Sequence, residues 1–376
     1  MTGLYDLIGI PFGYLMRLIY AIFKNYAVSI IVFTIITRLL MFPVSYSTQK
    51  SSARMALLNP KLEKLKKSFG SNPQRLQEEQ QKLYQEEGVN PMASCLPTFI
   101  QMFLLFGVLD VVYKPLTHIL DMSKSVINAA MNVAGIDPNK TGLRGELQIM
   151  EDLAVNKSNY SSLGENFAEK VYEFNEKFTI FGANLGKTPT LKPEVWTKEA
   201  IILAAIPFLA GLAQLIFSFY SQMHQKKVNP AMQQAGGGCM NIMLYGMPIF
   251  SVWMAFTFPA GLGFYWIWSS LITFIVTFAL NQYFTPERIK VINEKEKEKA
   301  RIYAEKHPEK KTFMQRMLEQ QAEMEKQQNG GTSAKSANKN KVSRSEQNKQ
   351  NRDKLKEARK RMAEKYGDDY DDNDEE

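Results

Sequence analysis

The stretch AVSIIVFTIITRLLMFPVSY, from Ala27 to Tyr46, decides how this chain folds, because it is apolar, long enough to cross a membrane and carries one arginine near its middle. A cation near a bilayer midplane costs about 2.5–3.5 kcal/mol on insertion scales, so it normally faces a water-filled cavity or a partner. Thr34 lies one turn before Arg38 on the same helical face. We interpret Arg38 and Thr34 as part of a hydrated intramembrane site. A snorkelling or structurally paired arginine is the alternative.

Four further apolar runs are long enough to cross the hydrocarbon core. Together with residues 27–46 they predict an all-α integral membrane protein with five transmembrane helices. The mean hydropathy of −0.25 is negative only because very polar regions offset these runs. Residues 1–26 show apolar residues at helical spacing and predict an amphipathic helix in the membrane interface, with a short extra span as the alternative. The four further spans are residues 95–113, 200–220, 240–258 and 262–284.

Three polar regions separate or follow the spans. Residues 47–94 contain three Asn-Pro pairs that mark helix starts and two apolar stripes, and these predict a helical hairpin rather than a solvated linker. Residues 114–199 form a long connection, in which residues 115–199 carry nine basic and eleven acidic residues. The tail, residues 285–376, has a basic surplus of ten up to Tyr366 and an acidic end, and its composition predicts disorder or a frayed helix.

The distribution of basic residues near the spans predicts the orientation. The hairpin carries eight basic and five acidic residues, the 221–239 loop carries Lys226 and Lys227, and the tail is basic. These regions are expected in the cytoplasm, with the N-terminus and the net-negative 114–199 loop outside. Five spans satisfy this alternation. The expected location is a bacterial plasma membrane.

Other kinds of chemistry find little support in the sequence. Cys95 and Cys239 and three scattered histidines give no metal-binding spacing and no disulfide framework. The segment GANLGKT, residues 182–188, is one residue short of a phosphate-binding loop. We therefore expect no cofactor and no metal. An enzyme is the least favoured class, because no nucleophile or base lies near Arg38 in the sequence.

Polar residues also follow one face of several predicted spans. Gln101 lies in the second span and Gln214 in the third. In a bilayer such residues usually face protein or water. Ordinary helix packing is the alternative explanation. The fifth span carries a polar seam at helical spacing, formed by Trp266, Ser270, Thr273, Thr277 and Asn281.

Several motifs occur in an order that resembles the YidC/Oxa1/Alb3 family of membrane protein insertases. They are ITRLLMFPV (residues 36–44), MALLNPKLEKLKK (55–67), LYQEEGVNPMASCLPTFIQM (83–102) and FPAGLGFYW (258–266). The resemblance covers about residues 14–284, and with five spans and no large N-terminal domain the chain looks like the Gram-positive form. It implies five helices around a hydrophilic groove, with Arg38 as the groove cation. Gln214, Trp266 and, less strongly, Gln101 would line the groove, and the polar faces add Thr34 and Ser270.

The resemblance implies an insertase and chaperone that works without nucleotide. The groove would attract the short hydrophilic tail of a nascent membrane protein, and the following hydrophobic segment would move into lipid. Expected partners are nascent membrane proteins and lipids, with the Sec translocon and, through the basic tail, ribosomal RNA as further candidates. A small-anion transporter that uses Arg38, or a membrane-anchored scaffold, are the alternative functions.

Overall fold

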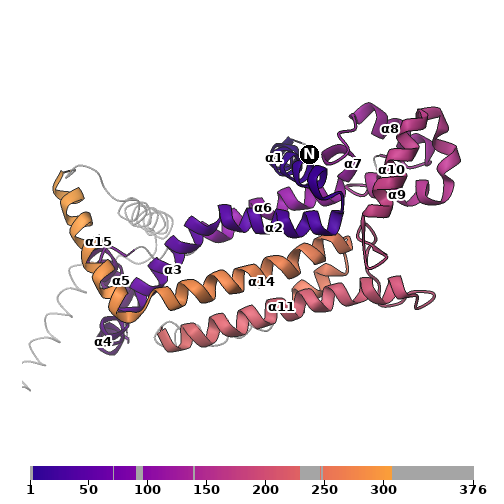
Figure 1. Cartoon of the computed structure of the whole chain (residues 1–376). Helices are drawn as coiled ribbons and strands as arrows, with labels where there is room; N and C mark the ends of the chain where they lie inside the picture. The colour runs from indigo at the N-terminus through magenta and orange to yellow at the C-terminus, as the bar shows by residue number, and fades with distance from the viewer. Residues whose placement is uncertain are drawn as a thin grey trace, which may run out of the picture. The chain divides into compact units, whose positions relative to one another are not determined.

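The protein is mostly helical in a computed structural model, which describes residues 3–70, 72–89, 96–138, 140–228, 246 and 249–306. Four helices lie side by side (Figure 1), and among them the closest pairs are α11 with α14 and α14 with α2. The other described helices gather at the two ends of this group. The four helices, which we call the long helices, are α2 (Tyr26–Leu40), α6 (Leu96–Tyr113), α11 (Lys198–Val228) and α14 (Ala260–Tyr283).

Two helices of the described chain, α11 and α14, are long and apolar enough to cross a membrane, and a bent pair of helices that includes α2 makes a third candidate. Residues 9–23 and 99–113 form shorter apolar helices. The predicted span at 240–258 lies largely outside the described residues, although 249–255 are helical. The mostly helical fold is thus confirmed, and the described chain holds two or three candidate membrane spans, whereas five spans stay a prediction.

The first predicted span differs from a single straight helix. Helix α2 ends at Leu40, and α3 (Phe42–Ala56) continues at an angle of 51°. Pro43 explains the break, because proline has no N–H to donate to Leu39 and its ring clashes with that carbonyl. The helix also continues ten residues beyond Tyr46, into the segment predicted as the hairpin. Arg38 therefore lies in the last turn of α2, next to the bend.

Helix α1 (Gly3–Phe23) packs on α6 and on His118, the last residue of the short helix that follows α6, through two glycines. A Cβ atom on Gly9 would lie 2.0 Å from Asp110 Oδ2, and one on Gly13 would lie 2.2 Å from His118 Nδ1. The two side chains beneath the glycines are themselves joined, with His118 Nε2 2.6 Å from Asp110 Oδ2. Small residues at these positions let α1 approach a buried polar pair closely.

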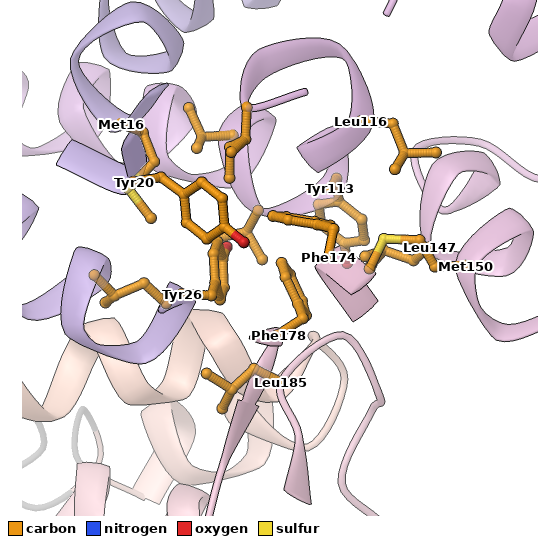
Figure 2. Close-up of a cluster of buried hydrophobic side chains, with 14 of the residues drawn as sticks. Met16, Tyr20, Tyr26, Tyr113, Leu116, Leu147, Met150, Phe174, Phe178 and Leu185 are labelled. Carbon is orange, nitrogen blue, oxygen red and sulfur yellow. The ribbon is translucent and has the colours of Figure 1, made fainter. Parts of the chain in front are cut away.

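Residues 114–197, between α6 and α11, fold into a small domain that we call the 114–197 domain. The sequence predicted only a polar connection here. Its apolar core is continuous with the ends of the long helices, and Figure 2 shows Tyr26 of α2 beside Phe174 and Phe178 of this domain. Its elements are α7 (Pro115–His118), α8 (Lys124–Val133), α9 (Gly145–Asn156), η2 (Lys157–Leu163), α10 (Glu165–Lys177), β1 (Thr179–Ile180) and β2 (Ala183–Asn184).

A buried carboxyl group in this domain makes its stability pH-dependent. Glu146 is 5% exposed and accepts hydrogen bonds from the Thr117 amide at 3.0 Å and the Thr117 hydroxyl at 2.5 Å. Burial raises the pKa of Glu146, and these hydrogen bonds offset the effect only in part. The folded domain thus favours the protonated form, so its stability falls as pH rises through the raised pKa.

We expect Glu146→Gln to flatten this pH dependence, because the amide stays neutral and can still accept from Thr117. The measurement is the thermal unfolding temperature of the two proteins from mildly acidic to mildly alkaline pH. Glu151→Gln, at a half-exposed position on the same helix, should keep the wild-type profile. An unchanged profile in Glu146→Gln would show that another group causes the dependence.

At the other end of the long helices, α4 (Asn59–Phe69) and α5 (Pro73–Glu86) pack against each other. Asn72 caps α5 by accepting a hydrogen bond from the Arg75 amide at 3.2 Å. Helix α15 (Pro286–Lys306) corrects the prediction that the tail is disordered from its start. It is ordered because Ile289 is buried with Leu280 and Phe284 of the preceding segment. Residues 307–376 lie outside the described part of the chain.

A polar cluster around the buried side chains of Arg54 and Glu87 joins α3, the end of α5 and α15. Arg54, 8% exposed, donates to Asn293 Oδ1 at 2.8 Å and to the carbonyls of Glu87 and Gly88 at 3.1 and 3.2 Å. The Glu87 carboxylate pairs with Lys61 and Lys297. Burial alone would raise the pKa of Glu87, but these lysines hold it below its usual value. The base of the helical pair is thereby tied to α15.

Candidate functional site

A cavity of about 370 Å³ lies between α2, α6, α11 and α14. Its wall mixes apolar side chains with amide and hydroxyl groups. Among the described residues that line it, Arg38 is the only one with a charge. The lining residues are Arg38, Gln101, Leu105, Ala210, Gln214, Phe217, Ser251, Trp266, Ser269, Ser270 and Thr273.

Arg38 is held on one side of this cavity by two neutral partners. Its Nη1 donates to Gln101 Oε1 of α6 at 3.2 Å, and its Nη2 donates to the hydroxyl of Ser269 on α14. The Nε atom is buried and has no hydrogen-bond partner among the described residues. No carboxylate of the described chain forms an ion pair with Arg38, so its charge is not neutralised within this part of the protein.

The opposite side of the cavity is also polar. Ser270 donates to Gln214 Oε1 at 3.0 Å and so links α14 to α11. Trp266 lies one turn earlier on α14. Its ring packs edge-on against the ring of Phe258, with the ring centroids 6.1 Å apart. The guanidinium of Arg38 and the side-chain amide of Gln214 therefore come from different helices and line the same cavity.

Five of the six groove residues predicted from sequence lie together at this cavity: Arg38, Gln101, Gln214, Trp266 and Ser270. Thr34 does not line it. Thr34 is fully buried, and its hydroxyl donates to the Ile30 carbonyl within α2 at 2.6 Å. A threonine in a membrane helix often satisfies its hydroxyl this way, so the helical face alone is a weak signal for a site residue.

Sequence reasoning missed Ser269, which is the residue of α14 that contacts Arg38. It is three residues after Trp266 and four before Thr273, so the spacing of the polar seam could have indicated it. It also missed Ser251, which belongs to the short described helical stretch 249–255. No pattern in the sequence indicates that position.

The polar seam of α14 continues into a second cavity of about 430 Å³, which reaches α3 and the start of α15. Thr277 and Asn281 line it, and Asn281 also donates to the Tyr220 hydroxyl at 3.2 Å. The other side is formed by Gln49 of α3 and His224 of α11. One face of α14 thus lines polar space from Trp266 to Asn281.

The described residues that line the cavity include no His, Cys, Asp or Glu, the side chains that usually hold a metal ion. No group of three or more His, Cys, Asp or Glu that could hold a metal ion occurs in the described part of the chain. The segment resembling a phosphate-binding loop ends a two-stranded hairpin, and the Lys187 carbonyl accepts the Ala260 amide at 2.9 Å. What the cavity offers is one unneutralised cation with several hydrogen-bonding groups beside apolar helices.

The fold and this cavity define a class: a helical membrane protein with a cationic polar cavity between apolar helices. The profile of the family described as "60Kd inner membrane protein" matches residues 18–288, which include every residue of the cavity. The chain belongs to this family, the YidC/Oxa1 family.

Two similar proteins are named membrane protein insertase YidC. The one from Treponema denticola is 25% identical over 273 residues, which are 72% of this chain and 36% of that protein. The one from Rickettsia massiliae is 25% identical over 281 residues, which are 75% of this chain and 40% of that protein. The chain thus matches about two fifths of the length of these relatives.

Proposed function

We propose that this protein is a membrane protein insertase. It binds the short hydrophilic tail of a nascent membrane protein in the cavity around Arg38, and it releases the adjacent hydrophobic segment between its apolar helices into lipid. The observation that carries this proposal is an arginine whose charge no described carboxylate neutralises, inside a polar cavity bordered by candidate membrane spans.

The physical reasoning has two parts. A guanidinium in a low-dielectric setting attracts an acidic segment strongly, because the interaction is screened less than in water. Polar lining along α14 from Trp266 to Asn281 shortens the apolar distance that such a segment must cross. The hydrophobic segment then leaves for lipid, which is favourable by about 25 cal/mol per Å² of apolar surface removed from water, so no nucleotide is required.

The orientation follows from the basic residues near the spans. We place α4, α5 and the tail in the cytoplasm, with the N-terminus and the 114–197 domain outside. The α4–α5 pair would then receive substrates at the cytoplasmic side, where the second cavity lies. The Sec translocon and the ribosome are further partners in this proposal, the ribosome through the basic tail.

The test is reconstitution of the purified protein into liposomes, followed by addition of a small single-span protein with an acidic N-terminal tail. We expect the tail to become protected from external protease without added nucleotide, at a rate well above that of protein-free liposomes. Equal protection in both liposomes would contradict insertase activity. Saturable uptake of a small anion without any insertion would instead favour a transporter.

A further inference from the structure

The 114–197 domain carries an exposed apolar surface that the proposed insertion route does not use. Six large apolar side chains between described residues 120 and 197 are exposed, and four of them lie within residues 181–196. We call these four the 181–196 surface. It consists of Phe181 (80% exposed), Leu191 (55%), Val195 (70%) and Trp196 (56%).

This surface lies at the ends of three candidate membrane-spanning helices. The Gly261 amide at the start of α14 donates to the Leu185 carbonyl at 2.7 Å. The Phe178 ring stacks on Tyr26 at the start of α2, with ring centroids 3.7 Å apart, and Figure 2 shows both near Leu185. Trp196 precedes α11 by two residues. Because the candidate spans leave the hydrocarbon core at these ends, we place residues 178–198 at the level of one membrane surface.

At the tip of the β1–β2 hairpin, Phe181 adopts a backbone conformation that is unfavourable for phenylalanine. The register pairs Thr179 with Asn184 and Ile180 with Ala183, which leaves a two-residue turn. Both turn residues have positive φ, 51° at Phe181 and 88° at Gly182. Turns of this kind favour Asn-Gly, and a phenylalanine in the left-handed region is disfavoured. Phe181 therefore strains the turn and gains little burial within the protein, which points to a contact outside it.

We propose that the 181–196 surface inserts into the interface of the adjacent lipid leaflet and anchors the 114–197 domain to the membrane. The occupant is lipid because the surface lies at the level where the spans end, and tryptophan is favoured at that depth. Lys192 and Lys198 flank the apolar residues and can extend their ammonium groups to lipid phosphates, whereas Lys187 pairs with Glu199 at 2.8 Å. This anchor is independent of whether the Arg38 cavity binds substrate.

The test places an environment-sensitive NBD fluorophore on single cysteines of the full chain, with Cys95 and Cys239 replaced by serine. The labelled positions are Phe181→Cys, Val195→Cys and the control Val155→Cys. Val155 is matched in exposure at 82%, and the hydrogen bonds of neighbouring Asp152 and Asn156 stay within the domain. The proteins are reconstituted in phosphatidylglycerol–phosphatidylethanolamine vesicles, with or without bromine on the acyl chains.

Probes at 181 and 195 should emit at shorter wavelength than the probe at 155 and lose most of their fluorescence in brominated vesicles. The emission shift and the bromine quenching do not depend on the direction of reconstitution, because the domain meets a leaflet of its own bilayer either way. Iodide is included on both sides of the vesicle membrane, so that it reaches the probe in either direction. Probes at 181 and 195 that match the 155 probe, unquenched by bromine and open to aqueous iodide, would overturn the proposal. Probes shielded from both quenchers would show a protein contact, which would also overturn it.

A second variant distinguishes contact of the Phe181 ring with lipid from packing of that ring within the protein. Phe181→Asn suits the turn, so in detergent its thermal unfolding temperature should equal or exceed that of wild type. A clear decrease would show that the Phe181 ring packs within the protein, and this would contradict the anchor.

Discussion

Replacing Arg38 by alanine is expected to slow insertion of the acidic-tailed substrate by at least about tenfold, which corresponds to about 1.4 kcal/mol. The physical reason is the loss of the only charge among the described residues that line the cavity. Arg38→Lys should retain much of the activity, because it keeps the cation even though it cannot reproduce the contacts to both Gln101 and Ser269. The measurement is the initial rate of tail protection in liposomes.

A matched control is Arg17→Ala. Arg17 is also half-buried, and it pairs with Asp121 at 2.7 Å and with the His118 carbonyl at 3.0 Å, away from the cavity. Loss of the Arg17 side chain should lower the stability of the protein. The folded fraction of the Arg17→Ala variant should still insert the substrate at the wild-type rate. Equal rates for wild type and a folded Arg38→Ala protein would remove Arg38 from the mechanism for this substrate.

Replacing Arg54 by methionine should destabilise the base of the α4–α5 pair by about 3 kcal/mol. Methionine fills similar space but donates no hydrogen bond, so Asn293 and the carbonyls of Glu87 and Gly88 lose a charged donor. Glu87 keeps its lysine partners, so we expect local loosening rather than global unfolding. Hydrogen–deuterium exchange should therefore increase in residues 59–89 and in α15 while α11 and α14 stay protected.

Lys50→Met is the control for this second prediction. Lys50 lies one turn before Arg54 on α3, and its ion pair with Glu296 is longer, at 3.4 Å, and partly exposed. Exposed pairs contribute about 0–1 kcal/mol, so exchange should hardly change. Unchanged exchange in Arg54→Met as well would show that the cluster does not hold the α4–α5 pair to α15.

Sequence patterns were informative where a property is local. Apolar run length indicated the helices that became α6, α11 and α14, because hydrophobic length is a property of consecutive residues. The free-energy cost of placing a cation inside a membrane indicated Arg38 as a site residue before any of its contacts were known. The polar seam of α14 indicated Trp266 and Ser270, since helical spacing places them on one face.

Features that depend on packing between distant segments could not be read in this way. The spacing of the polar seam is compatible with Ser269, but its contact with Arg38 joins two helices that are distant in the sequence, and spacing within one helix does not show it. The 114–197 domain folds because scattered residues such as Phe178 and Leu185 are buried against α2 and α14. Helix α15 has the composition of a disordered tail, yet burial of Ile289 orders its start.

The most direct test of the central claim is disulfide trapping of a substrate tail inside the cavity. The substrate carries one cysteine in its acidic tail and a stably folded domain next to the tail, which stops insertion part-way. It is added to liposomes that contain the protein with Cys95 and Cys239 replaced. Single cysteines are placed at Ser270, which lines the cavity, and at Ile275 of the same helix, which is 61% exposed outside it. We predict a cross-link to position 270 and none to 275. Cross-linking to 275 alone, or to neither, would contradict passage of the tail through the Arg38 cavity.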